Sequence, residues 1–156
     1  ESNPSAITSI SEADIIVIGP GSLFTSILPN LLVPGINAAL ESTDARKIYV
    51  CNVAQEIGET DGYSAQDHVR TLQTYTSENI ANLVIINQSS SPIDGHPSIQ
   101  PVVPGKQIAD KISNIPVIST ELMDSENPIH HDPEKLAQVI IDVYHGKLPP
   151  RGVETK

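Results

Sequence analysis

Four apolar runs divide the chain, and segments with helical or turn character separate them. Three runs are nearly continuous rather than alternating with polar residues: Ile15–Ile18, Lys47–Val53 and Leu83–Asn87. A fourth run, Pro116–Ser119, is shorter. Such runs are typical of strands buried on both faces, which occur in parallel sheets covered by helices. The pattern therefore predicts four strands of a mostly parallel sheet.

Helical patterns lie between and after these runs. We expect a helix over Ser22–Leu31, after a Gly-Pro-Gly turn, and a second short helix over Pro34–Leu40. A Ser-x-x-Asp capping box opens a predicted helix over Ser64–Tyr75. The last helix is expected between its cap, Asp132, and Gly146, because apolar residues recur there on one helical face. Strand and helix alternate, which predicts a doubly wound α/β domain.

Composition and charge narrow the class of protein. The 156 residues suit one domain and contain no Trp, one Phe and one Met, so Ile, Val, Leu and Ala must form the interior. Asp plus Glu is 19 and Lys plus Arg is 9, a net charge of −10, which disfavours nucleic acid and anionic lipid. No apolar run approaches the ~20 residues that span a bilayer. With Cys51 as its only cysteine, we expect a cytoplasmic protein without disulfides.

The strongest chemical signal is the Gly19–Ser22 turn after the first predicted strand. Ligands of open α/β sheets bind beyond the carboxyl ends of the strands, where a helix start offers N–H groups to an anion such as phosphate. Gly21 would let the backbone approach a ligand, and Ser22, Thr25 and Ser26 would add hydroxyl donors. The alternative is an ordinary turn with a Ser cap. The turn lacks the Lys of a P-loop.

A second polar loop, Gly58–Tyr63, follows the second predicted strand and belongs to the same edge of the sheet. Its carboxylates, with Asp67, could hold a ribose or sugar hydroxyl or a divalent cation. Alternatively, Glu59 and Asp61 are solvated loop residues and Asp67 serves only the helix cap. The predicted ligand-binding set is Gly19, Gly21, Ser22, Thr25, Ser26, Asn30, Asn52, Glu59, Thr60, Asp61 and Asp67. We assign no catalytic residue.

Two further segments carry less specific signals. His130 and His131 are adjacent, a spacing poorly suited to one metal ion, and Asp132 already has a role as helix cap, so we assign no metal site. Residues 88–105 are rich in Ser and Pro. A connection of this length is functional or mobile, for instance as a contact for a partner protein, or it is an insertion of no consequence.

Two long stretches resemble a known family. Ala13–Val33 and Gly58–Val69, with asparagines at the predicted strand ends (Asn52 and Asn87), are similar to signatures of the gluconeogenesis factor family. These are the YvcK-like relatives of 2-phospho-L-lactate transferase (CofD). The resemblance implies a Rossmann-like fold and a nucleotide-linked ligand, and we further expect a homo-oligomer.

The resemblance also implies a function. It indicates a non-catalytic regulator of carbon metabolism and cell shape that binds a UDP-sugar or another phosphorylated small molecule. The one cofactor that we expect is a divalent cation bound together with a nucleotide ligand. The alternative is a transferase-like enzyme that moves a phospholactyl group from a guanosine diphosphate donor to a deazaflavin. That branch reads closer to Gly-Pro-Ser-Asn-Pro in the first loop, whereas this chain reads Gly-Pro-Gly-Ser-Leu, as in the regulatory branch.

The sequence differs from the family pattern at two places. Family members begin with a Gly-Gly-Gly-Thr-Gly nucleotide loop, which does not occur in this sequence. They also often have Arg-His-Asp where this chain has His130–Asp132. We therefore expect residues 1–156 to be the C-terminal portion of a single CofD-like domain.

Overall fold

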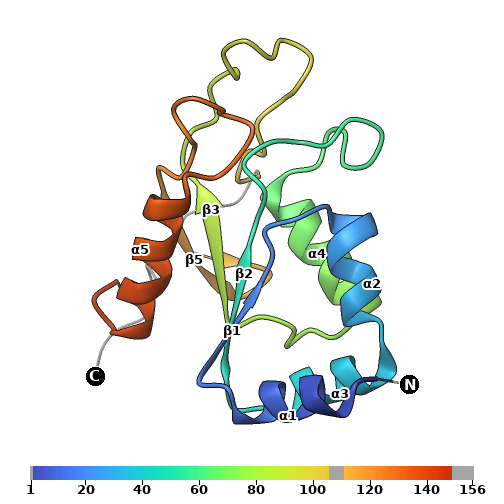
Figure 1. Ribbon diagram of the computed structural model, residues 1–156. Coiled ribbons are helices and arrows are strands. Elements are labelled where there is room, and N and C mark those ends of the chain that lie inside the picture. The colour runs from blue at the N-terminus through green and yellow to red at the C-terminus, as the bar shows by residue number, and fades with distance from the viewer. Residues whose placement is uncertain (1, 106–110, 149–156) are drawn as a thin grey trace.

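The computed structural model describes residues 2–105 and 111–148 (Figure 1). The elements in chain order are α1 (Pro4–Glu12), β1 (Ile15–Ile18), the π-helical η1 (Leu23–Ile27), α2 (Leu28–Leu31), α3 (Pro34–Ser42), β2 (Arg46–Val50), α4 (Ala65–Tyr75), β3 (Leu83–Asn87), β4 (Lys111–Ile112), β5 (Ile115–Thr120) and α5 (Pro133–Tyr144). The four strands predicted from apolar runs are therefore confirmed as β1, β2, β3 and β5. Helix α1 and strand β4 were not predicted.

The five strands form one sheet in the order β1-β2-β3-β5-β4. The pairs β1–β2, β2–β3 and β3–β5 are parallel, and only β4 runs antiparallel to its neighbour β5. Ser113 and Asn114 adopt positive φ in the tight turn between β4 and β5. The prediction of a mostly parallel sheet is confirmed, with one short antiparallel edge strand.

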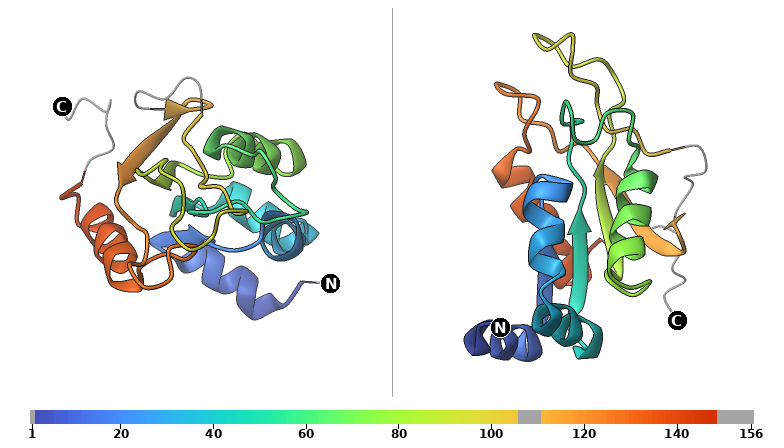
Figure 2. Two further views of the ribbon diagram at one scale, coloured as in Figure 1. Left: turned by 90° about the horizontal axis from the view of Figure 1, so that it is seen from above. Right: turned by 90° about the vertical axis from the view of Figure 1, so that its right-hand side faces the viewer.

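Helices cover both faces of the sheet, as a doubly wound fold requires. In Figures 1 and 2, α5 lies against one face while α2 and α4 lie against the other. Successive residues of β2 show how the strand serves both layers: Tyr49 packs in the cluster with α2 and α4, and Ile48 and Val50 pack in the cluster with α5. Helices α1 and α3 lie together at the amino ends of β1 and β2. The loops that follow β1, β2, β3 and β5 start at the opposite, carboxyl edge of the sheet (Figure 1).

The helix boundaries follow the local signals closely. Asp132 caps α5 by accepting from two backbone N–H groups, and Gly146 follows α5 with φ +69°. The helix predicted over Ser22–Leu31 is instead a π-helical turn followed by α2. Pro29 has no backbone N–H. It lies in the first turn of α2, where N–H groups have no acceptor within the helix, so α2 loses no hydrogen bond.

Within the described residues, no single helix is long and apolar enough to cross a membrane. The consecutive segments Leu23–Leu31 and Pro34–Ser42 reach that length and composition only as a pair, across a bend of 74°.

Candidate functional site

The loop after β1 is held tightly at its first glycine. Gly19 has φ +80°, and a Cβ on it would lie 3.0 Å from the Val50 carbonyl oxygen and 3.2 Å from the Ile27 side chain. Gly21 is different, because a Cβ there would make only ordinary contacts of 3.7 Å or more with the protein. The fold therefore requires glycine at position 19, whereas nothing in the described protein requires it at position 21.

The polar groups of this loop are bound by side chains that follow β2. The Gly21 N–H donates to Asn52 Oδ1 at 3.1 Å, and the Ser22 hydroxyl donates to Glu56 Oε2 at 2.6 Å. Asn52 Nδ2 in turn donates to Glu56 Oε1 at 2.8 Å. The Glu56 carboxylate thus joins two loops that are 34 residues apart in the sequence.

The start of the loop after β2 is fixed around Thr60. This side chain is fully buried, and its hydroxyl accepts from the Glu56 N–H at 2.9 Å. Glu59 reaches back to the loop after β1, where its Oε2 accepts from the Phe24 N–H at 3.4 Å. The two loops predicted to share one edge of the sheet are therefore in direct contact.

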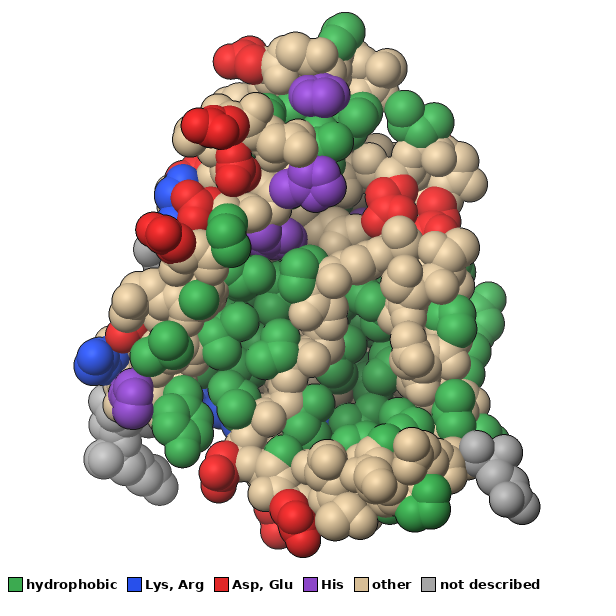
Figure 3. All heavy atoms as spheres, in the orientation of Figure 1, with side chains coloured by type: hydrophobic (Ala, Val, Ile, Leu, Met, Phe, Trp, Pro, Cys, Tyr) green, Lys and Arg blue, Asp and Glu red, His purple; other side chains and the backbone are tan. Residues whose placement is uncertain are grey.

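A cavity of about 780 Å³ opens at this carboxyl edge. It is lined by Pro20–Ser22 from the β1 loop, by Asn52–Ile57 from the β2 loop, by Ile99, and at the entry to α5 by Ile129, His130, His131, Pro133 and Leu136. Figure 3 shows acidic and histidine side chains around the upper half of this face, above a broad hydrophobic area. Parallel strands place their carboxyl ends together, which is why segments so distant in sequence meet here.

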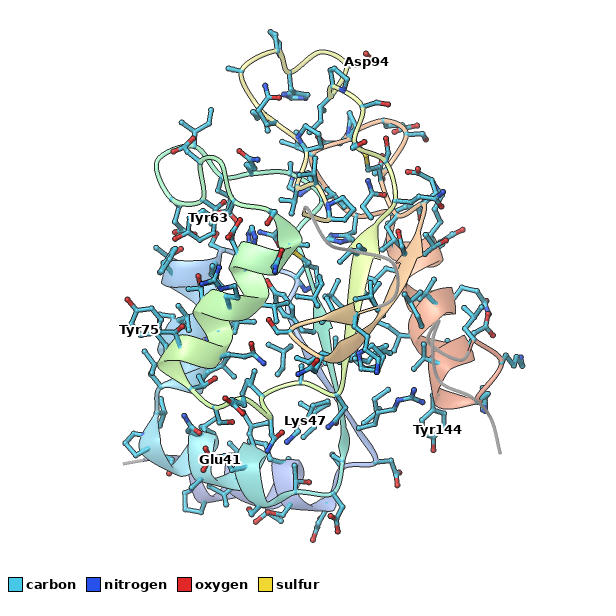
Figure 4. All side chains as sticks on the ribbon, turned by 180° about the vertical axis from the view of Figure 1, so that it is seen from behind. Glu41, Lys47, Tyr63, Tyr75, Asp94 and Tyr144 are labelled. Carbon is cyan, nitrogen blue, oxygen red and sulfur yellow. The ribbon has the colours of Figure 1, made fainter. Side chains whose placement is uncertain are left out.

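Residues 88–105 reach the cavity at Ile99 and are attached to the β2 loop next to it. The Gln55 and Val102 N–H groups donate to the Gln100 and Val53 carbonyls, at 2.8 and 2.9 Å. The Gln55 side chain adds hydrogen bonds to the Gly62 N–H and to the carbonyls of Tyr63 and Pro101. Figure 4 shows Asp94 at the far tip of this long connection. The connection therefore contributes Ile99 to the cavity wall and is held in place by the β2 loop.

The entry to α5 contributes two histidines to the cavity lining, and they differ in exposure. His130 is exposed, whereas His131 is partly buried. Burial lowers the pKa of the His131 imidazole, against an opposing hydrogen bond to the Cys51 backbone. Cys51 lies in the core, and burial raises the pKa of its thiol to about 12, so it is a packing residue. In the described ranges, no three His, Cys, Asp or Glu side chains are arranged to hold a metal ion.

Several predicted ligand residues lie away from this cavity. Ser26 and Asn30 line a second, aliphatic groove of about 380 Å³ beside β1, and Thr25 is exposed. Asp61 is exposed, and its carboxylate accepts from the Gly58 N–H within the same loop. Asp67 completes the predicted capping box with Ser64, and those hydrogen bonds lower the pKa of its carboxyl.

Aromatic contacts connect η1 to α4 through Tyr63. The Phe24 and Tyr63 rings meet edge to face at 6.2 Å, and Tyr63 meets His68 at 5.6 Å. Figure 4 shows Tyr63 at the end of α4 that faces the loops and Tyr75 at its other end. His68 is fully buried, its Nδ1 lies 2.9 Å from the Ser64 carbonyl, and burial lowers its pKa.

Sequence reasoning missed the carboxylate that joins the two loops of the site. Glu56 was not in the predicted set, although it stands four residues after the strand-end Asn52 and before the glycine-bounded loop. The apolar half of the cavity was also missed, because Ile99 and Ile129 carry no chemical motif of their own. A search for carboxylates next to Asn52, rather than only within the loop signature, would have found Glu56.

Fold and site together define an α/β protein with a ligand-sized cavity at the carboxyl ends of a parallel sheet. The chain belongs to the CofD family, described as 2-phospho-L-lactate transferase CofD, whose model matches residues 1–148. The resemblance to gluconeogenesis factors is confirmed by relatives of that name. The one from Bacillus subtilis is 37% identical over 147 residues, and the one from Halalkalibacterium halodurans is 35% identical over 151 residues.

Solved structures agree with the fold. A member of the UPF0052 family from Bacillus halodurans matches with a TM-score of 0.78 at 33% sequence identity, over 90% of this chain and 47% of that one. The two relatives are matched over 90% and 87% of this chain, but over only 46% and 44% of their own length. The chain therefore spans less than half the length of these relatives.

Proposed function

We propose that this chain is the ligand-binding part of a gluconeogenesis factor, a non-catalytic cytoplasmic regulator of carbon metabolism and cell shape that binds a UDP-sugar. The observation that carries the proposal is the cavity at the carboxyl edge of the sheet, in a chain whose relatives bear the name gluconeogenesis factor. A volume of about 780 Å³ lies within the usual range for small-molecule sites.

In this proposal the polar side of the cavity contacts the ligand through Ser22, Asn52 and Glu56, and Gly21 allows close approach of its backbone. The nucleotide diphosphate is accompanied by a divalent cation, because the chain carries a net charge of −10 and supplies little positive charge of its own.

Calorimetric titration with UDP-N-acetylglucosamine in magnesium buffer tests the proposal. We expect saturable heat, and omission of magnesium should weaken binding. Absence of heat at millimolar ligand would remove the UDP-sugar assignment.

A matched pair of variants localises the binding. Ile99→Trp extends a cavity-lining side chain into the space, whereas Ser98→Trp adds the same ring at the adjacent exposed position. Binding should be lost in Ile99→Trp and retained in Ser98→Trp. Equal affinities in the two variants would place the ligand elsewhere.

A second candidate function rests on the name of the family model, 2-phospho-L-lactate transferase. In that case the protein would move a phospholactyl group from a guanosine diphosphate donor to a deazaflavin acceptor, with Asp61 or Asp67 holding a cation. Incubation with both substrates, followed by chromatography of the deazaflavin, decides the question. Transfer above the rate without protein would favour the enzyme over the regulator.

A further inference from the structure

The cavity at the carboxyl edge has two chemically distinct walls. One wall is aliphatic and comes from three separate segments, with Val53, Ile99 and Leu136 among its residues. The other is polar: the connected side chains of Ser22, Asn52 and Glu56 form one part of it, and Gln55, His130 and His131 form the rest. A ligand that fills this space must therefore present an apolar surface on one side and hydrogen-bonding groups on the other.

The connected side chains of Ser22, Asn52 and Glu56 have more acceptor positions than donors to offer a ligand. Each Glu56 oxygen already accepts one hydrogen bond, but a carboxylate has about four acceptor positions in total. The Ser22 hydroxyl donates its proton to Glu56 and keeps only its lone pairs for a ligand. Asn52 donates one of its two side-chain N–H groups to Glu56 and keeps the other for a ligand, while its Oδ1 accepts from the Gly21 N–H. This part of the wall thus suits a ligand that donates hydrogen bonds, such as a hydroxyl.

The charge of the wall leads to the same conclusion. None of the described residues that line the cavity is Lys or Arg, and Glu56 brings a carboxylate into it. The Phe24 N–H, near the start of η1, is directed at the Glu59 carboxylate rather than at open space. The Ser22 hydroxyl and the Phe24 N–H are therefore already bound to acidic side chains, and the Gly21 N–H is bound to the Asn52 amide. A phosphate beside Glu56 would meet like charge.

From this geometry we propose that the cavity holds the sugar end of the nucleotide sugar, and that the diphosphate binds outside it. The proposal rests on the function proposed above and deepens it. Sugar hydroxyls donate to the free acceptor positions of Glu56 and Ser22. The carbon face of the ring, and an N-acetyl methyl where there is one, packs on the aliphatic wall with Ile99 and Leu136.

Calorimetry with two probes and one charge-removing substitution tests the assignment. UDP-N-acetylglucosamine and UDP are titrated into the unsubstituted chain, into Glu56→Gln, and into Glu78→Gln as a control. Glu78 is exposed and lies outside this cavity, so its variant removes the same charge far from the site. Glutamine has the shape of glutamate and can keep one of the two internal hydrogen bonds, and a urea melt checks that the variant is folded.

We expect the unsubstituted chain to bind UDP-N-acetylglucosamine about tenfold or more tightly than UDP, since hydrogen bonds to a charged group would be lost with the sugar. Glu56→Gln should weaken binding of the UDP-sugar by about tenfold on the same grounds and leave binding of UDP unchanged. Glu78→Gln should change neither affinity.

The outcomes separate this inference from the proposed function. Three results would overturn the sugar assignment without affecting the proposal that the chain binds a UDP-sugar. They are equal affinities for UDP and the UDP-sugar, tighter binding of UDP by Glu56→Gln, and an unchanged affinity of Glu56→Gln for the UDP-sugar. If neither probe binds the unsubstituted chain, the proposed function fails, and the sugar assignment fails with it. The comparison of the two probes needs no variant, so it decides the matter even if Glu56→Gln does not fold.

Discussion

The loop after β1 and the tip of the loop after β2 differ in how far the fold has fixed them. In the first, Gly19 is enclosed by Val50 and Ile27, and the Gly21 N–H is bound to a neighbouring side chain. In the second, Gly58 and Gly62 have positive φ but no neighbouring atom within 4 Å of the Cβ position. Both loops therefore need glycine for a backbone with positive φ, but only at Gly19 does the surrounding protein also leave no room for a side chain.

The largest effect is expected at Gly19. Gly19→Ala should lower the free energy of unfolding by about 3 kcal/mol, because alanine is strained at φ +80° and its Cβ would press on the Val50 carbonyl. Gly21→Ala, two residues away, should change it by less than about 1 kcal/mol. Urea unfolding followed by circular dichroism measures both. Similar losses in the two variants would contradict the distinction between an enclosed and an open glycine.

Thr60 tests whether the base of the β2 loop is fixed like the β1 loop. Thr60→Val keeps the shape but leaves the Glu56 N–H without its acceptor, so we expect a loss of about 2 kcal/mol in unfolding free energy. Thr60→Ser keeps the hydroxyl and should lose only about 0.8 kcal/mol, for one buried methyl group. If valine were tolerated as well as serine, the buried hydrogen bond would not hold the loop.

The sequence predicted the elements that have strong local signals and missed those that do not. Strands and helix ends were predictable because their signals are local: the continuous apolar run of β3, the capping box at Ser64 and the Asp132 cap. Helix α1 was missed although Asn3 caps it and Pro4 begins it, because its apolar residues are sparse. Strand β4 was missed because two residues carry no periodicity.

The candidate site was only partly predictable, for a physical reason. The location of the Gly19–Ser22 and Gly58–Tyr63 loops at one edge of the sheet follows from the parallel topology, which the apolar runs imply. Which side chains face the cavity depends on tertiary hydrogen bonds such as Ser22 to Glu56, and no local pattern encodes these. The loop signatures therefore located the edge of the sheet correctly, but they did not separate Glu56 from Asp61.

Asp67 should show an intermediate effect that depends on pH. Asp67→Ala removes half of the capping box of α4 and should reduce the unfolding free energy by about 1 kcal/mol at pH 7. The folded-state pKa of Asp67 lies below its unfolded value of about 3.9, so its contribution is present above that pH and is lost as the pH falls through the folded-state pKa. Unfolding curves of both proteins should therefore converge below about pH 4. If the difference in unfolding free energy between the two proteins stayed constant with pH, the charged form of Asp67 would not be the stabilising form.

Asp61, at the tip of the β2 loop, should show the smallest effect. Its carboxylate binds the Gly58 N–H in an exposed turn, and asparagine offers the same acceptor, so Asp61→Asn should stay within about 0.5 kcal/mol of the unsubstituted chain. Urea unfolding under the conditions used for Gly19→Ala gives the comparison directly. A loss of the size expected at Gly19 would mean that the tip is as constrained as the β1 loop. The free positions of this edge would then lie only around the cavity, where Gly21 tolerates a side chain and the carboxylate of Glu56 has acceptor positions to spare.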